Sequence, residues 1–149
     1  MDYKMLKKEI DALTQGVPYE TANLANASAA LRQAMGNINW VGFYLMEMGK
    51  LVLGPFQGKP ACIEIPLGRG VCGTAAQEKR TVLVEDVHQF PGHIACDSAS
   101  NSEIVVPIFK NGAVYGVLDI DSPYVSRFTI EDQRELEEIV KILEKNLFS

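Results

Sequence analysis

The spacing of hydrophobic positions changes several times along the chain, and each change marks a new element. Over residues 2–15 the apolar side chains recur every three or four positions, and Gly16 and Pro18 then interrupt the pattern. This periodicity predicts one helix over 2–15, and an alanine-rich run of good helix formers predicts a second helix over 22–35. From Asn39 the period is two, which is typical of strands, and Met48-Gly49-Lys50 marks the turn of a hairpin.

The second half of the chain predicts short strands, one short helix and a long final helix. Asn111-Gly112 is a strong signal for a tight hairpin, and Thr129 with Asp132 predicts the start of the last helix. The expected segments are a loop over 54–60, strands over 61–66 and 81–85, a helix over 71–78, a loop over 86–102, and strands over 103–109 and 114–121. This order predicts an α+β fold. We expect one domain over 1–149, with N- and C-terminal helices on one side of a mainly antiparallel sheet.

Two strands carry side chains that suit a ligand pocket. Alternation places Trp40, Gly42 and Tyr44 on one face of the first strand. The glycine between the two aromatic residues would leave room for a ligand beside them. The alternative is that both aromatic residues belong to the core.

The last strand combines two carboxylates on one face. Alternation groups Tyr115 and Val117 with Asp119 and Asp121, and sets Val114 on the opposite face. Carboxylates two residues apart lie about 7 Å from each other. In a cleft their repulsion raises at least one pKa or requires a cation, whereas on a solvated face it has little effect.

Composition narrows the function classes. The chain has 149 residues, 47% of them hydrophobic, and a formal net charge of −5, and no apolar run approaches the roughly 20 residues of a membrane helix. Without a Lys/Arg stripe, neither nucleic acid nor an anionic membrane is an expected partner. The N-terminus lacks the features of a secretory signal, so we expect a cytoplasmic protein.

The three cysteines are the strongest candidates for chemistry. Cys96 lies in a polar, small-residue loop, which is an unusual place for a structural thiol. Cys72 falls in the first turn of the short helix, where a lowered thiol pKa is expected. With Cys62 the three form a possible redox set, and the alternative is three scattered small hydrophobic residues.

A zinc site is the other use of such thiols. His88 and His93 are further potential ligands, but no closely spaced pair such as CxxC or HxxxH is present. We therefore expect no metal and no cofactor.

Four segments together resemble a known family. The chain is similar over about residues 20–147 to the GAF-domain free methionine-(R)-sulfoxide reductases, and the cysteine spacing of ten and then twenty-four makes the match specific. The segments are Asn39–Tyr44, Gly70–Gly73, His93–Pro107 and Gly116–Ser122.

This resemblance implies roles for the residues singled out above. Cys96 would attack the sulfoxide sulfur, with Cys62 and Cys72 as candidates for the resolving thiol. The substrate would be free methionine sulfoxide, thioredoxin would be the reductant, and a homodimer is possible. The substrate site would consist of aromatic residues and carboxylates, namely Trp40, Tyr44, Glu103, Asp119 and Asp121.

The residue types suit this reaction. A sulfoxide oxygen leaves only after protonation, so a general acid must lie near it, and a buried carboxylic acid can supply the proton. Attack by a thiolate produces a sulfenic acid, which a second thiol converts to a disulfide. The alternative function is a non-catalytic GAF module that senses a small ligand or redox state.

Overall fold

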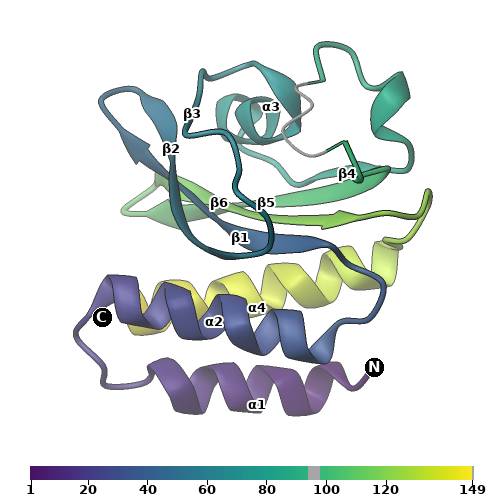
Figure 1. Cartoon of the computed structure of the whole chain (residues 1–149). Coiled ribbons are helices and arrows are strands. Elements are labelled where there is room, and N and C mark those ends of the chain that lie inside the picture. The colour runs from purple at the N-terminus through teal and green to yellow at the C-terminus, as the bar shows by residue number, and fades with distance from the viewer. Residues whose placement is uncertain (94–97, 149) are drawn as a thin grey trace.

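A six-stranded antiparallel sheet separates a helical side of the molecule from a side that carries a pocket (Figure 1). The structure is a computed structural model that describes residues 1–93 and 98–148. The strand order is β3-β2-β1-β6-β5-β4. The elements are α1 (Tyr3–Thr14), α2 (Glu20–Ala34), β1 (Trp40–Glu47), β2 (Lys50–Gln57), β3 (Glu64–Ile65), α3 (Gly70–Glu78), β4 (Val82–Val84), η1 (Val87–Gln89), β5 (Ser102–Lys110), β6 (Ala113–Ser122) and α4 (Ile130–Phe148).

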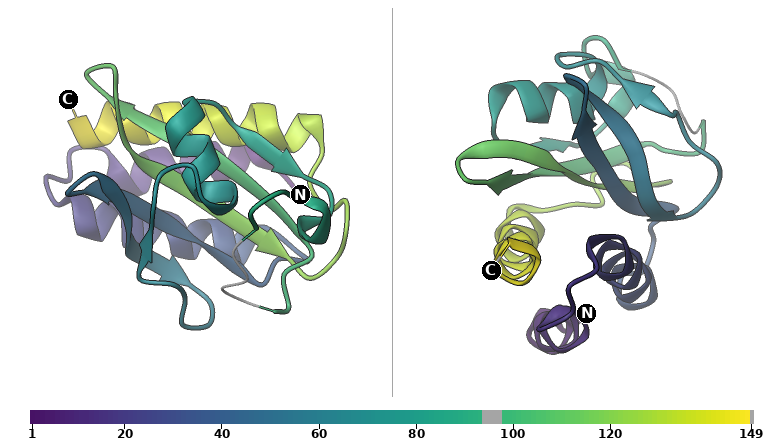
Figure 2. Two further views of the ribbon diagram at one scale, coloured as in Figure 1. Left: turned by 90° about the horizontal axis from the view of Figure 1, so that it is seen from above. Right: turned by 90° about the vertical axis from the view of Figure 1, so that its left-hand side faces the viewer.

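Three helices cover one face of the sheet in two layers. Helix α2 packs on β1 and β2, α4 packs on β5, and α1 lies outside them against α2 and α4, as the right panel of Figure 2 shows. The predicted start of α4 is confirmed, since Thr129 and Asp132 accept hydrogen bonds from each other's backbone N–H. The predicted α+β architecture with its terminal helices on one side is therefore confirmed.

The opposite face of the sheet carries α3 and a second hydrophobic cluster. Figure 2, left, shows α3 lying across this face. Val71 and Ala75 of α3 pack with Val105 and Val117, which β5 and β6 contribute to that face. The predicted short helix is confirmed, and Cys72 lies in its first turn.

The region between β1 and α3 differs from the prediction. Strand β2 continues to Gln57 through the stretch predicted as a loop, while β3 is limited to Glu64–Ile65, so Cys62 lies on irregular chain. The pairing of β1 with β2 shifts by one residue between Gly42 and Tyr44. An irregularity of this kind accommodates Pro55, which has no N–H to donate to a regular ladder.

The β5–β6 hairpin has the predicted turn but an unpredicted bulge. Asn111 and Gly112 both have positive φ, of 52° and 81°, as a tight hairpin turn requires. Ile108 pairs with Gly116 and Phe109 with Val114, so Tyr115 is an extra residue in β6.

The bulge moves two side chains to faces that alternation does not predict. Tyr115 packs against the helical-side core and donates a hydrogen bond to Glu20 of α2, at 2.7 Å. Val114 packs with the cluster on the pocket side. The predicted faces of these two residues are therefore wrong, whereas Val117, Asp119 and Asp121 share one face as expected.

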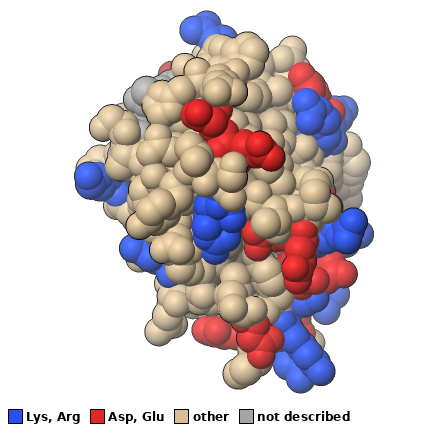
Figure 3. All heavy atoms as spheres, turned by 90° about the vertical axis from the view of Figure 1, so that its right-hand side faces the viewer, with Lys and Arg blue, Asp and Glu red and all other residues tan. Residues whose placement is uncertain are grey.

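The outer surface mixes charges of both signs. Acidic and basic side chains are interspersed on the face that Figure 3 shows. Among the described helices, none has the length and apolar character needed to cross a membrane.

Candidate active site

A pocket lies on the sheet face that α3 covers, between the sheet and the segments that follow β2 and η1. Its floor comes from β1, β5 and β6, and its sides come from α3 and the segments around residues 60 and 93. The lining residues are Trp40, Tyr44, Pro60, Ala61, Ile65, Arg69, Gly70, Val71, Cys72, His93, Ser100, Glu103, Asp119 and Asp121.

Three carboxylates are buried in the floor of this pocket. Glu103 of β5 pairs directly with Asp121 of β6, and Asp119 lies two residues before Asp121 on the same face. Glu103 and Asp121 are each 8% exposed and Asp119 is 5% exposed. Burial of a carboxyl group is unfavourable, so three buried carboxyl groups side by side indicate a functional site.

The bulge at Tyr115 brings Glu103 into this group. The hairpin closes with Lys110 opposite Ala113, and an unbroken ladder from that pair would set Glu103 opposite Ile120. Ile120 belongs to the helical-side core. The extra residue shifts the register by one, so Glu103 lies opposite Asp121 and faces the pocket.

Burial raises the pKa values of Glu103 and Asp119 and so favours their protonated forms. Desolvation raises the pKa of Glu103 well above its ordinary value of 4.5, and the charges of Asp119 and Asp121 raise it further. The pKa of Asp119 is also raised, because desolvation outweighs its hydrogen bonds with Glu103 and Cys72. Glu103 is therefore the carboxyl group best suited to remain protonated and donate a proton near neutral pH.

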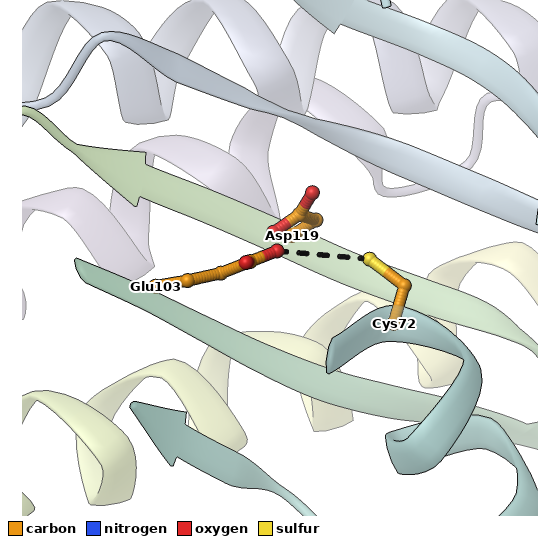
Figure 4. A group of neighbouring side chains, drawn as sticks. All are labelled: Cys72, Glu103 and Asp119. Carbon is orange, nitrogen blue, oxygen red and sulfur yellow. Dashed lines mark hydrogen bonds between the residues drawn. The ribbon is translucent and has the colours of Figure 1, made fainter. Parts of the chain in front are cut away.

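The thiol of Cys72 completes a compact group of three side chains. Its Sγ lies 3.9 Å from Oε2 of Glu103, and Figure 4 shows Cys72 on α3 pointing toward Glu103 and Asp119. Burial raises the pKa of the Cys72 thiol, and the neighbouring carboxylates raise it further. The pKa lowering predicted from the helix position is therefore wrong, because desolvation and like charge outweigh the helix N-terminus.

One ligand atom from each of these three side chains lies within 4.8 Å of the others, so Cys72, Glu103 and Asp119 could hold a metal ion. A thiolate is a soft donor and carboxylates are hard donors. The sequence argument against a metal considered the spacing of Cys and His, and it could not detect ligands that three separate elements contribute.

Aromatic rings form one wall of the pocket. Trp40 stacks on Tyr44 at 5.9 Å between centroids and on Phe56 at 5.1 Å. Phe56 lies opposite Gly42, and a Cβ on that glycine would clash with the Cβ of Phe56. The room predicted beside Gly42 is therefore occupied by Phe56, which the sequence argument had placed in a loop.

The polar atoms of the two predicted aromatic residues hold the chain that closes the pocket. Trp40 Nε1 donates to the Lys59 carbonyl at 3.1 Å, and the Tyr44 hydroxyl donates to the Cys62 carbonyl at 2.9 Å. The segment that carries Cys62 is thus fixed against the aromatic wall.

The two described cysteines differ in state. Cys62 is disulfide-bonded, whereas Cys72 has a free, buried thiol. Cys96, the predicted nucleophile, lies outside the described residues, which end at His93 and resume at Ser98.

Sequence reasoning missed part of the pocket lining. Arg69, His93 and Ser100 line the pocket with the predicted residues. Burial, and to a lesser extent the charge of His88, lower the pKa of His93. Arg69 directly precedes the Gly70–Gly73 segment and Ser100 lies within the His93–Pro107 segment, and these positions were the signal that could have found them.

A family model for the GAF domain matches residues 23–145 of the chain. A curated free methionine-R-sulfoxide reductase of Escherichia coli (strain K12) is 54% identical over 145 residues, which cover 97% of this chain and 88% of that protein. The chain belongs to the GAF-domain free methionine-R-sulfoxide reductases. The predicted family and fold are therefore confirmed.

Solved structures of the family superpose closely on this fold. The reduced form of fRMsr from Staphylococcus aureus is 57% identical, with a TM-score of 0.96, and covers 98% of this chain and 95% of its own. The enzyme of Neisseria meningitidis, solved in complex with its substrate, is 48% identical, with a TM-score of 0.94, and covers 97% of this chain and 87% of its own. Family members therefore bind substrate on this same scaffold.

Proposed function

We propose that this protein reduces free L-methionine (R)-S-oxide to L-methionine through a cysteine sulfenic acid and an intramolecular disulfide. The observation that carries the proposal is the buried acidic pocket, in which Glu103 has a raised pKa beside Asp119, Asp121 and an aromatic wall. Relatives named as free methionine-R-sulfoxide reductases support the choice of substrate.

The residues of the pocket suit the parts of the substrate. The ammonium group of a free amino acid would pair with the ionised carboxylates, and the S-methyl group would pack against Trp40. Glu103, as a carboxylic acid, would donate its proton to the sulfoxide oxygen. Fixed positions for methyl group, oxygen and attacking thiol would select the R configuration.

Cys96 would supply the nucleophile. Its thiolate attacks the sulfoxide sulfur while the oxygen takes the proton; the hydroxyl then transfers to the Cys96 sulfur as the transient S–S bond breaks. Methionine departs, and Cys96 is left as a sulfenic acid. Cys62 then attacks the Cys96 sulfur, which forms a disulfide and releases water. The two thiols lose two electrons in total, and these reduce the sulfoxide.

Two features favour Cys62 over Cys72 as the resolving thiol. Cys62 is disulfide-bonded, while Cys72 is free. Burial and the adjacent carboxylates raise the pKa of the Cys72 thiol, which makes it a poor source of thiolate. Thioredoxin would reduce the disulfide by exchange, and the protein would act in the cytoplasm as a single-domain enzyme.

Turnover of the R and S sulfoxides of free methionine with a thioredoxin system tests the proposal. The wild type should reduce the R form, and Cys96→Ser should abolish turnover. Absence of turnover with either form, or full turnover by Cys96→Ser, would overturn the enzyme proposal and favour a sensor.

Mapping the disulfide by mass spectrometry after one turnover tests the choice of resolving thiol. We expect a Cys62–Cys96 bridge, and thioredoxin-supported turnover should fall much more in Cys62→Ser than in Cys72→Ser. A bridge to Cys72 would reverse the assignment.

A further inference from the structure

Cys72 is the buried reactive group that the proposed mechanism leaves without a chemical step. Its thiol is free, and it lies in the pocket beside two carboxyl groups that have raised pKa values. Within the described residues, neither Glu103 nor Asp119 forms an ion pair with a lysine or arginine. A cation bound beside Glu103 and Asp119 would therefore be electrostatically favourable.

A second observation points to a ligand at the same place. Oδ1 of Asp119 is buried and has no hydrogen-bond partner among the described residues, and Asp119 as a whole is only 5% exposed. A buried carboxyl oxygen without a hydrogen-bond partner is energetically unfavourable. An ion or polar ligand in the pocket would satisfy it.

The geometry suits a tetrahedral metal. With Zn–S bonds of about 2.3 Å and Zn–O bonds of about 2.0 Å, a sulfur and an oxygen ligand lie about 3.5 Å apart. Sγ of Cys72 and Oε2 of Glu103 are 3.9 Å apart, and all three donor atoms lie within 4.8 Å of one another. Shifts of under about 1.5 Å would complete three ligands and leave a fourth position open to the pocket.

We propose that Cys72, Glu103 and Asp119 bind one Zn²⁺ ion, which competes with the sulfoxide substrate for the acidic pocket. The thiolate favours Zn²⁺ over Mg²⁺ and Ca²⁺, which take oxygen ligands. The Cys72 proton passes to solvent as the thiolate bonds to the metal. The predicted competition rests on the proposed function, because competition requires that the substrate occupies this pocket. The predicted metal binding does not depend on that function.

Cobalt binding to a protein with a single thiol tests the site without using turnover. In the full-length Cys62→Ser/Cys96→Ser variant, Cys72 is the remaining cysteine of the three. Co²⁺ should bind with 1:1 stoichiometry and give a thiolate-to-cobalt charge-transfer band in the near ultraviolet. One equivalent of Zn²⁺ should abolish the band, since Zn²⁺ binds such ligands more tightly than Co²⁺.

Additional substitutions identify the ligands in the same background. Cys72→Ser should remove the charge-transfer band, and Asp119→Asn should weaken Zn²⁺ binding at least tenfold in equilibrium dialysis. Glu131→Gln, at an exposed position on α4, is the matched control and should bind as the parent does. Absence of saturable 1:1 cobalt binding in the Cys62→Ser/Cys96→Ser parent, or a band that survives Cys72→Ser, would overturn the site. The result for the parent is decisive even if a further variant does not fold.

Steady-state kinetics of the wild type test the competition. Zn²⁺ should raise KM for methionine sulfoxide at least tenfold and leave kcat unchanged, whereas inhibition confined to kcat would overturn competition for the pocket. An enzyme without activity would overturn the proposed function and leave the cobalt result standing.

Discussion

The two faces of the central strands bury their side chains almost equally well but use opposite chemistry. Toward the helices, Phe43 of β1 and Leu118 and Ile120 of β6 are fully buried among apolar neighbours. On the other face, Asp119 and Asp121 are also buried, beside Glu103 and a thiol. The same backbone therefore carries one face that stabilises the fold and one whose burial of acid groups is unfavourable, which is typical of functional sites.

The largest effect is expected on the helical face. Leu118→Ala removes a fully buried side chain and should lower the free energy of unfolding by about 2–5 kcal/mol. Urea denaturation measures this change. Met48→Ala, at a side chain that is 92% exposed, is the control and should change stability by at most about 0.5 kcal/mol; similar losses in both variants would remove the contrast between core and surface.

Substitutions of the acidic residues on the pocket face should lower enzymatic activity without lowering stability. Glu103→Gln and Asp119→Asn should each lower turnover at least tenfold, about 1.4 kcal/mol in activation free energy, because each alters the proton donor or the charge beside it. Stability should stay equal or rise, since a buried acid is replaced by a neutral amide. Glu131→Gln is the control, and near-normal kinetics in both pocket variants would refute the acidic-cluster mechanism.

The raised pKa of Glu103 predicts a pH dependence of stability. The folded state retains a proton that the unfolded chain releases near the ordinary pKa of 4.5. This contribution is complete below that pH and is lost as pH rises toward the folded pKa, with a slope of at most about 1.4 kcal/mol per pH unit. Urea denaturation between pH 4.5 and 8 should therefore show a smaller decline in Glu103→Gln than in the wild type, while Glu131→Gln should follow the wild type. Equal slopes in all three proteins would contradict the assignment.

The smallest effect tests which face Tyr115 belongs to. Tyr115→Phe removes the hydrogen bond to Glu20 and should lower the free energy of unfolding by about 0.5–1 kcal/mol, with unchanged turnover. Thermal or urea denaturation and a standard assay check both parts. A change in kcat would indicate that Tyr115 acts on the pocket face, where simple alternation had placed it.

Local signals accounted for most of the elements. The spacing of apolar residues predicted α1 and α4, a run of good helix formers predicted α2, and the alternation around Trp40 and Asp119 predicted β1 and β6. Two errors arose where a bulge interrupts a strand, at Pro55 in β2 and at Tyr115 in β6. A bulge depends on pairing with the neighbouring strand, and no local pattern in the sequence reports it.

The sequence by itself determined the family, the residue types of the site, and the shared face of Asp119 and Asp121, because these depend on composition and on a period of two. Tertiary structure decided that Glu103 faces them, through the one-residue shift in register at Tyr115. It also decided that Cys72 lies against these acids with a raised pKa. Desolvation and the repulsion between buried charges exist only when separate elements enclose the same small volume.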